Sequence, residues 1–340
     1  MPRISVLAGG ILSFVTLTGG PSAALQADVI RSIGGLPPRI VAAFEEPVAF
    51  QQAANGVYYV FDRRAHTVWT VDPGRTLARK AVTIGAEPGR ILDPYGFDVA
   101  PDGSFAVADV PMREDRVQIF DQTGTWKGGF FIRGNTSVRI TIGNLVLNGI
   151  GAIRHTGRSL LVSNPESDAL FTEYSLDGRS ARSIGRLRPT GHEQDRDLHL
   201  AMNSGLPLVD PTGGYYFVFI TGQPMFRKYD GEGTLVFERH IEGREIDQLI
   251  ANQPRTWPRR RVEDHEVPVV APVVRTAEVD PRGRLWVSLA VPYTYVYDNA
   301  GDKVRSVQFS ATDTISPASL SFSPRGTLLV TPGCYEFAVD

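Results

Sequence analysis

The chain has 340 residues, and its 35 Lys and Arg residues nearly balance 37 Asp and Glu residues, for a formal net charge of −2. This balance excludes a protein that binds nucleic acid through a strongly basic surface, because such binding depends on a positive field. The single cysteine excludes an internal disulfide framework and any metal or iron–sulfur site with several cysteine ligands. The 34 glycines and 24 prolines favour a fold with many turns.

The N-terminus combines a positively charged start, an apolar stretch over residues 4–18 and small residues up to Ala27. This order is typical of a secretory signal peptide, so we expect residues 1–27 to be removed and the mature protein to be periplasmic or secreted. The alternative is retention as a membrane anchor, although the stretch is shorter than the roughly 20 apolar residues of a spanning helix. No transmembrane span is expected after cleavage, which leaves peripheral association with a membrane open.

The clearest repeat unit lies at residues 94–130. Short runs with alternating apolar residues are separated there by Asp-Gly and Asp-x-x-Gly turns, as at Asp102-Gly103 and from Asp121 to Gly124. Such a pattern predicts four antiparallel strands in a meander.

The same pattern recurs six times along the chain. A turn glycine between the first two strands of each unit is found at Gly56, Gly103, Gly157, Gly213, Gly283 and Gly326. An aspartate that closes the third strand follows each glycine, at Asp72, Asp121, Asp177, Asp230, Asp298 and Asp340. A four-stranded sheet cannot bury both faces alone, so the repeats predict an all-β fold, a six-bladed β-propeller of four-stranded antiparallel blades over residues 28–340.

The sixth unit shows only three strands, the third ending at Asp340. An unassigned apolar stretch at residues 40–44 precedes the first unit and follows Pro37-Pro38. We therefore expect this N-terminal stretch to form the fourth strand of the last blade. Such pairing would close the ring and cover an exposed sheet edge.

An insertion at residues 244–273 interrupts the spacing between the fourth and fifth units. Residues 245–251 have apolar positions at helical spacing and end before Pro254, which predicts a short helix. The rest of the insertion is interrupted by prolines and is interpreted as a long loop, a kind of segment that is usually functional or disordered. We interpret the insertion as a lid or docking arm, with an interaction surface at Trp257, Arg259, Arg260 and Arg261.

The second unit resembles the NHL repeat family. The resemblance rests on its Pro-x-Gly-Phe start at residues 94–97, its Asp102-Gly103 turn, the strand end at residues 107–109 and the string at residues 116–124. It implies a propeller fold over residues 40–340 apart from the insertion, and it leaves activity open, because such propellers include binding scaffolds, interaction modules and lyases. In this repeat type, the pair Asp109 and Arg116 is expected to brace the loop of its own blade.

Propeller ligands bind where strand ends converge on one mouth of the central channel. We expect this mouth to take the loops after each second strand, such as residues 62–64, together with the starts of the first strands, such as Glu46-Pro47 and Pro94-Tyr95. The predicted binding residues at the mouth are Asp109, Arg113, Asn164, Glu166, Gln223 and Tyr293. No set of catalytic residues is recognisable among them.

The alternative is a gluconolactonase-like, metal-dependent hydrolase or an NHL-type lyase. The resemblance to gluconolactonases would imply one divalent cation such as Ca²⁺ or Zn²⁺, with metal ligands among Glu46, Asn148 and Asn203. The catalytic Asp-Gly expected of that family is not evident, since Asp280 and Gly283 belong to a turn between strands.

The densest group of histidines and acids lies at residues 192–199. It is not a His-Glu-x-x-His zinc motif, because Arg196 stands where the second histidine would be. We interpret it as a solvated connection between the third and fourth blades. The sequence as a whole therefore favours a non-catalytic binding or protein-interaction module without a cofactor. We expect its partners to be proteins of the cell envelope, which would make it an accessory subunit of an envelope complex.

Overall fold

The computed structural model describes residues 27–132, 140–142, 145–147, 153–262 and 265–339. Four separate antiparallel sheets contain four strands each, and in each sheet the strands follow chain order. The first is β2 (Pro47–Gln52), β3 (Tyr58–Asp62), β4 (Thr67–Val71) and β5 (Ala78–Val82). The second is β6 (Gly96–Val99), β7 (Phe105–Asp109), β8 (Arg116–Phe120) and β9 (Trp126–Phe131). The third is β12 (Ile153–His155), β13 (Ser159–Val162), β14 (Ala169–Ser175) and β15 (Ser180–Arg186). The fourth is β16 (Gly205–Val209), β17 (Tyr215–Phe219), β18 (Met225–Tyr229) and β19 (Leu235–His240). The predicted four-stranded meanders are therefore confirmed.

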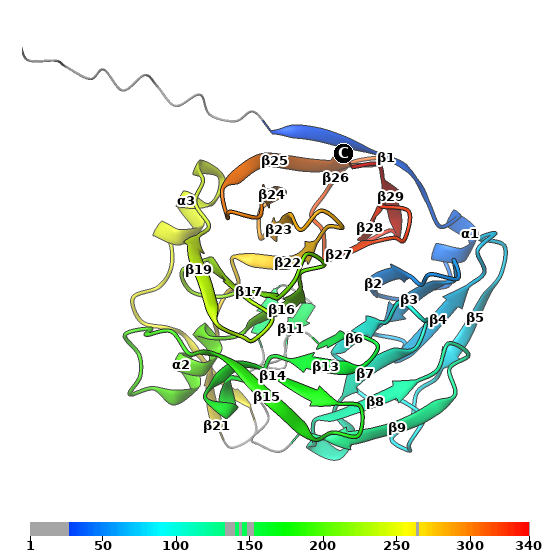
Figure 1. The fold of residues 1–340 in the computed structure, drawn as a ribbon, viewed down its shortest axis with the longest axis horizontal. Coiled ribbons are helices and arrows are strands. Elements are labelled where there is room, and N and C mark those ends of the chain that lie inside the picture. Colours follow the sequence, from blue (N-terminus) through cyan, green and yellow to red (C-terminus); the bar gives the residue numbers. More distant parts are fainter. Residues whose placement is uncertain (1–26, 133–139, 143–144, 148–152, 263–264, 340) are drawn as a thin grey trace, which may run out of the picture.

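The remaining large sheet has nine strands and joins the two ends of the chain. One antiparallel part is β22 (Val274–Val279), β23 (Leu285–Leu289), β24 (Thr294–Tyr297) and β25 (Lys303–Ser310), with β26 (Thr314–Ile315) paired to β25. The other part is β27 (Ser319–Phe322), β28 (Leu328–Thr331), β29 (Tyr335–Phe337) and β1 (Asp28–Gly35). Figure 1 shows the sheets arranged around a central axis, with β1 along the outer edge beside β25 and β29.

Strand β1 links the two parts of the nine-stranded sheet. Its first half pairs in parallel with β25, from Asp28 opposite Val307 to Arg31 opposite Ser310. Its second half pairs antiparallel with β29, with Gly35 opposite Tyr335. An N-terminal strand thus covers the edge of the last meander, as expected.

The prediction that residues 40–44 form this strand was wrong. Residues 40–44 do not pair with a sheet, because helix α1 (Pro38–Val41) begins at the proline pair. Proline is well suited to the first turn of a helix, where its missing N–H is not needed and its φ is already helical. Ile40 packs instead into a cluster with Phe50 and Tyr58.

The recurring glycines and aspartates have the local roles that their spacing predicts. All six turn glycines lie between the first two strands of a meander and have φ between 80° and 122°, which favours glycine. At Asp121, the carboxylate accepts hydrogen bonds from the backbone N–H groups of Thr123 (2.9 Å) and Thr125 (3.0 Å). These bonds and that from the Thr123 hydroxyl lower the pKa of Asp121. The corresponding residue of the last unit, Asp340, lies outside the described residues.

Neighbouring sheets pack face to face through large apolar side chains. Phe105 of β7, for example, stacks on Phe120 with ring centroids 5.1 Å apart and contacts Tyr59 of the preceding sheet at 5.6 Å. The Tyr59 hydroxyl donates to the carbonyl oxygen of Gly103 at 3.0 Å. The core therefore lies between successive sheets rather than in the centre of the ring.

Three short segments depart from the regular meanders. Helix α2 (Arg196–Met202) and helix α3 (Arg244–Ala251) lie on either side of the fourth sheet in the sequence, and β20 (Arg259–Val262) pairs with β21 (His265–Pro268). Helix α3 confirms the predicted helix, whereas the hairpin replaces part of the expected loop. The group at residues 192–199 is not merely a solvated connection, because it runs into α2, which buries Leu198, Leu200, Ala201 and Met202.

Further short elements lie outside these sheets. Strands β10 (Ile140–Ile142) and β11 (Leu145–Leu147) form a hairpin. The turns η1 (Pro111–Arg113) and η2 (Pro165–Ser167) follow second strands. Within the described residues, no helix is long and apolar enough to cross a membrane.

Candidate functional site: the central channel

The centre of the ring is lined by the first strand of each meander. Strands β2, β6, β12, β16, β22 and β27 lie beside one another around the axis, and β27 returns to β2. Two cavities lie along this channel and share Gln51, Asp98 and Arg154 in their walls. We name them after their most distinctive residues, the Arg275 cavity (about 130 Å³) and the His155 cavity (about 510 Å³).

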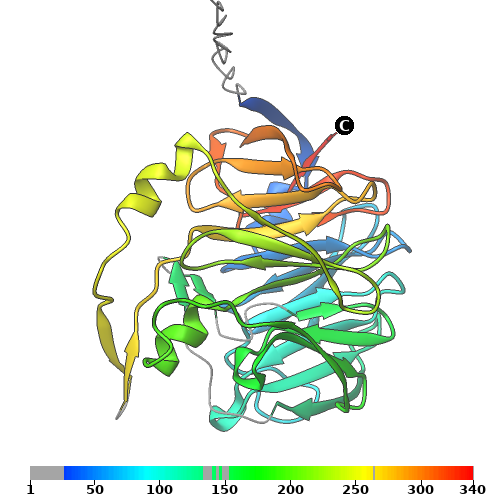
Figure 2. The same ribbon diagram turned by 60° about the vertical axis from the view of Figure 1, so that its left-hand side comes forward.

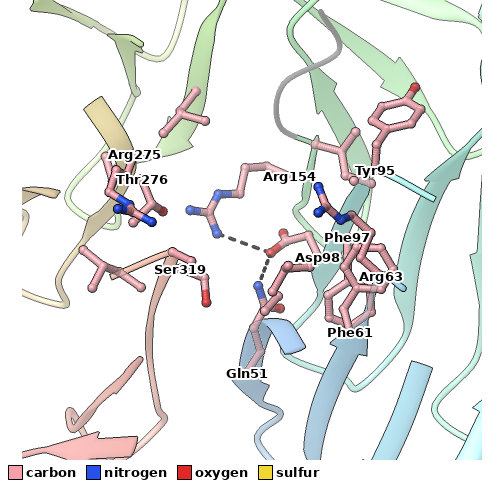
Figure 3. A pocket seen from close by; sticks show the side chains of 18 of the residues that line it. Gln51, Phe61, Arg63, Tyr95, Phe97, Asp98, Arg154, Arg275, Thr276 and Ser319 are labelled. Atoms are coloured by element: carbon pink, nitrogen blue, oxygen red, sulfur yellow. Dashed lines mark hydrogen bonds and ion pairs between the residues drawn. The ribbon is translucent and has the colours of Figure 1, made fainter. Parts of the chain in front are cut away.

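The Arg275 cavity combines apolar walls with three arginines. Figure 3 shows Arg275 and Thr276 on one side of the cavity, Arg63 and Tyr95 on the other, and Arg154 between them. The apolar walls are Val48, Ala49, Phe61, Phe97, Ile153, Leu206, Leu208, Ala277, Ala318 and Leu320. A cavity with few polar groups in apolar surroundings is the usual form of a small-ligand site.

Arg154 of β12 forms a bridge across the channel between two carboxylates. Its Nη2 donates to Oε2 of Glu278 at 2.8 Å, and its Nη1 donates to Oδ1 of Asp98 at 3.3 Å. The same Asp98 oxygen accepts from Nε2 of Gln51 at 3.0 Å, while its second oxygen accepts from the backbone N–H of His155 at 2.6 Å. We call Asp98, Arg154 and Glu278 the channel bridge. It ties β6, β12 and β22 together across the axis.

The charges of the channel bridge are strongly coupled. Burial alone would lower the pKa of Arg154, but the carboxylates of Glu278 and Asp98 raise it above its usual value. Burial raises the pKa of Glu278, and Arg154 offsets this only in part. Arg154 is therefore a cation already neutralised by its own chain.

Arg63 is also neutralised. Its guanidinium contacts the Glu46 carboxylate through two hydrogen bonds, from Nη2 to Oε1 (2.6 Å) and from Nε to Oε2 (3.2 Å). Two-point pairing of this kind fixes both groups in one orientation. Arg63 thus contributes a rigid wall to the Arg275 cavity rather than a free charge.

Arg275 differs from both other arginines. The pairing of β22 with β23 shifts between Val274 and Thr276, so Arg275 occupies a β-bulge. Bulges redirect side chains and are frequent beside functional sites. Its Nε atom is buried without a hydrogen-bond partner, and within the described part of the chain its guanidinium has no ion-pair partner. Burial lowers the pKa of Arg275.

The His155 cavity lies on the other side of the channel bridge. The ring of His155 contacts the Ser104 hydroxyl through Nε2 at 3.1 Å and accepts the backbone N–H of Gly157 at Nδ1 (3.2 Å). Burial lowers the pKa of His155, and Asp98 opposes this only in part. These contacts describe a neutral imidazole that stabilises a turn at the wall of the cavity.

Four of the residues predicted at the channel mouth, Asp109, Asn164, Gln223 and Tyr293, are not among the residues that line the two channel cavities. Of the loops after second strands, the one after β3 contributes Arg63 to the Arg275 cavity. The six predicted residues are at the ends of four second strands, β7, β13, β17 and β23, or in the segments that follow them: Asp109, Arg113, Asn164, Glu166, Gln223 and Tyr293.

Asp109 is held by hydrogen bonds within its own part of the chain. It is wholly buried, and its oxygens accept from Arg116 at 2.9 Å and 2.6 Å and from the backbone N–H of Leu92 at 3.0 Å. Arg116 also donates to the carbonyl oxygens of Ala86 (2.7 Å) and Arg90 (3.0 Å). The pair braces the segment that enters its own sheet, as expected from the repeat resemblance, so Asp109 is not available to a ligand.

The other predicted mouth residues lie in separate places. Arg113 ends the η1 turn and Glu166 is the middle residue of the η2 turn. Asn164 is buried just before η2 and accepts the Ser167 N–H at its carbonyl (3.1 Å). Tyr293 packs on the apolar cluster of the fourth and fifth meanders, and Gln223 lines a different cleft beside helix α2.

The residues that do line the channel were partly predicted. Arg63 and Tyr95 belong to segments that the sequence placed at the mouth, and both line the Arg275 cavity. Asp98, Arg154, Arg275 and Glu278 were missed. The available signal was a charged residue within the otherwise apolar first strand of a repeat, because that strand borders the channel.

Two of the three residues of the metal-binding alternative are bonded within the chain. Glu46 is held by Arg63, and Asn203 is fully buried, with its amide bonded to the backbone of Arg188 and His199. Asn148 lies outside the described residues. In the described ranges, no group of three or more His, Cys, Asp or Glu residues is placed to hold a metal ion.

The arm residues contact their own chain. Trp257 packs against a cluster of Leu198, Ala201, Met202 and Val270, and Arg259 forms an ion pair with Asp195 at the start of α2. Arg260 and Arg261 are exposed on β20. In Figure 2 the segment from α3 to the β20–β21 hairpin runs along one side of the molecule.

Comparison with solved structures identifies the class of the fold. A streptogramin B lyase structure is similar with a TM-score of 0.51 at 10% identity, covering 87% of this chain and 94% of that one. A virginiamycin B lyase from Staphylococcus aureus has a TM-score of 0.50 at 10% identity, covering 84% of this chain and 77% of that one. No protein-family model and no curated protein sequence matches the chain. The protein is a β-propeller with four-stranded antiparallel blades, and at this identity the likeness concerns the fold alone.

Proposed function

We propose that the protein is an exported, six-bladed, NHL-like β-propeller that serves as a binding module. We count six blades by dividing the nine-stranded sheet into β22–β25 and β27–β29 with β1, which is supported by the six first strands around the channel. Export is supported by the signal-peptide pattern of residues 1–27. The proposed partners are proteins of the cell envelope.

The chemical group that the channel is best suited to bind is a carboxylate. The observation that carries this proposal is Arg275, a guanidinium in a largely apolar cavity that has no partner in the part of the chain that the structure describes. Buried polar groups normally have partners, so an unsatisfied one suggests a missing ion or ligand. An anion about 4 Å from a guanidinium gains about 4 kcal/mol at an effective dielectric constant of 20, and a carboxylate can bind it at two points.

The size of the cavity limits what can enter. At about 130 Å³, the Arg275 cavity has room for a carboxylate on a short chain but not for a large ligand. Such a group is present on small organic acids and on the acidic side chains of a protein partner. Both sources share the chemistry that Arg275 would recognise.

The experiment is calorimetric titration of the purified protein with sodium propionate at constant ionic strength. Propionate is expected to bind the wild type, and Arg275→Met is expected to weaken it at least about tenfold, or 1.4 kcal/mol. Arg282→Met is the matched control, because Arg282 is exposed on a turn of the same blade. Propionamide, the neutral analogue, should bind more weakly than propionate.

Equal binding of propionate to both variants, or no binding to the wild type, would overturn the carboxylate site. The source of the carboxylate is resolved by purification from native envelope with wild type and Arg275→Met. A protein retained by the wild type alone would favour an acidic side chain of a partner. A small acid recovered from the wild type alone would favour a free ligand.

The second candidate is a lyase or a metal-dependent hydrolase. It is supported by the fact that two structures of similar fold are lyases, a likeness of fold alone. The described residues do not fit a divalent cation, since Glu46 and Asn203 are already bonded within the chain. Elemental analysis of wild type and Glu46→Gln tests this candidate. Stoichiometric Ca or Zn that is lost in the variant would favour it over a binding module.

A further inference from the structure

A second cleft lies outside the channel, between the insertion and the fourth sheet. We define the arm cleft as the cavity of about 450 Å³ that is lined by Arg188, His192, Gln223, Arg227, His240 and Trp257, among others. We propose that the arm cleft is a binding site for an aromatic carboxylate or a similar compound with one anionic group and a flat apolar body. This site is independent of the channel and of the function proposed above.

The walls of the arm cleft come from three parts of the chain. The segment that leads to α2 contributes Arg188 and His192, the fourth sheet contributes Arg227 and its neighbours, and the insertion contributes Trp257. A volume of about 450 Å³ lies within the range of about 300–1,000 Å³ for small-molecule sites. The Arg275 cavity, at about 130 Å³, is below this range.

The insertion is fixed in place, so the cleft is already formed without a ligand. Trp257 packs on the cluster that includes Leu198 and Met202 of α2. Nε2 of Gln253 donates to the carbonyl oxygen of Gly222 at 2.8 Å, which joins the insertion to the fourth sheet. The ion pair between Arg259 and Asp195 adds a second link to α2. A preformed wall reduces the ordering cost of binding.

The charge at the back of the cleft is a buried arginine held by neutral groups. Arg188 is 7% exposed, and its guanidinium donates to the carbonyl oxygens of Gln223 (2.5 Å), Thr221 (2.7 Å) and Met202 (2.9 Å). It also lies 4.3 Å from the ring centroid of Phe219. Carbonyl oxygens and a ring face orient the cation but do not neutralise it.

Glu238, a carboxylate that also lines the cleft, is already paired with another arginine. Glu238 accepts from Nε of Arg227 at 2.5 Å, and Arg227 also donates to the carbonyl oxygen of Arg186 at 2.6 Å. Burial and the neighbouring charge of Arg227 lower the pKa of Arg188 to about 10, and Glu238 opposes this only weakly. The cleft therefore has an excess positive charge, and burial of an uncompensated cation is unfavourable unless an anion joins it.

The remaining walls suit a flat apolar body. Trp257, Met202, Met225 and Pro254 line the same cleft as Arg188. Tryptophan offers a large planar surface and methionine adapts to the shape of an aromatic group. An anionic group near Arg188 with a ring beside Trp257 would use both features at once.

The first test is calorimetric titration with benzoate, and with benzamide as the neutral analogue of the same shape. Benzoate is expected to bind the wild type, with benzamide at least about tenfold weaker. Trp257→Ala should weaken benzoate about tenfold, whereas Trp126→Ala, at an exposed tryptophan of β9, should leave it unchanged. Arg275→Met should also leave benzoate binding unchanged, which separates this site from the channel.

The second test locates the ligand without any substitution. Crystals soaked in 4-bromobenzoate are expected to show a bromine anomalous peak in the arm cleft. The proposal is overturned if benzoate and benzamide bind equally, if benzoate does not bind, if Arg275→Met abolishes its binding, or if the bromine lies only elsewhere. Loss of propionate binding in the channel experiment would not affect this result.

Discussion

Arg154 of β12 and Arg275 of β22 line the same channel from strands on either side of β16, but they have opposite environments. Arg154 forms ion pairs with Glu278 and Asp98, which raise its pKa. Burial lowers the pKa of Arg275, which has no counter-charge among the described residues. The first arginine completes an internal charge network and the second leaves one charge uncompensated. Arginines that look alike in the sequence can therefore hold the fold together or mark a binding site, and only their partners distinguish them.

The largest effect is expected from breaking the channel bridge. Arg154→Met leaves the carboxylates of Asp98 and Glu278 buried without their cation, so the free energy of unfolding should fall by about 3–5 kcal/mol at neutral pH. Urea denaturation measures this loss. A loss below about 1 kcal/mol would place the bridge among ordinary exposed ion pairs and weaken the contrast with Arg275.

The effect of Arg154→Met should depend on pH. Burial already raises the pKa of Glu278 above that of the unfolded chain, so on acidification the folded state takes up this proton first. Removing the cation raises this pKa further. The destabilisation is therefore present above the folded-state pKa and shrinks as the pH falls from about 8 toward about 5. Denaturation curves at both pH values check it, and an equal loss at both would contradict the assignment to Glu278.

The opposite change in the free energy of unfolding is expected for Arg275→Met. Arg275→Met removes a cation whose Nε is buried without a partner, so the ligand-free protein should become more stable by about 1 kcal/mol. The same variant should lose propionate binding, a trade of function for stability. Arg282→Met should stay within about 0.5 kcal/mol of the wild type. Destabilisation by Arg275→Met would indicate that the chain itself compensates this charge.

The smallest effect on stability is expected for His155→Gln, at the cavity on the other side of the channel bridge. Burial lowers the pKa of His155, so the unfolded chain binds a proton first when the pH falls through about 6.5. Stability should therefore decline on acidification, and His155→Gln should remove about 1 kcal/mol or less of this decline. Urea midpoints between about pH 7.5 and about pH 5.5 measure the change, and an unchanged pH slope in the variant would assign the decline to other groups.

Local features of the fold were predictable from the sequence because their contacts are local. Each turn glycine needs a positive φ within a few residues of the strands that it joins, and Asp121 bonds to Thr123 and Thr125. Helix α3 was predicted for the same reason, since apolar spacing and the following proline act within one segment. The residues of the strand that closes the ring were not predicted correctly, because β1 pairs with residues near the other end of the chain.

The site was less predictable than the fold. Arg63 and Tyr95 were expected at the channel, because they flank strands whose position the repeat determines. Nothing near Arg154 in the sequence indicates its pairing with Glu278, which is 124 residues away. In the same way, nothing near Trp257 in the sequence indicates its packing on α2.

The sequence alone determined the repeat, the turns and the balance of charge, since these depend on residue type and spacing. The tertiary structure decided which strand covers the last edge, which arginines find carboxylates and which do not. The physical reason is that pairing of charges in the channel depends on strands from different blades meeting at the axis. Only in that arrangement is Arg154 neutralised while Nε of Arg275 has no hydrogen-bond partner among the described residues.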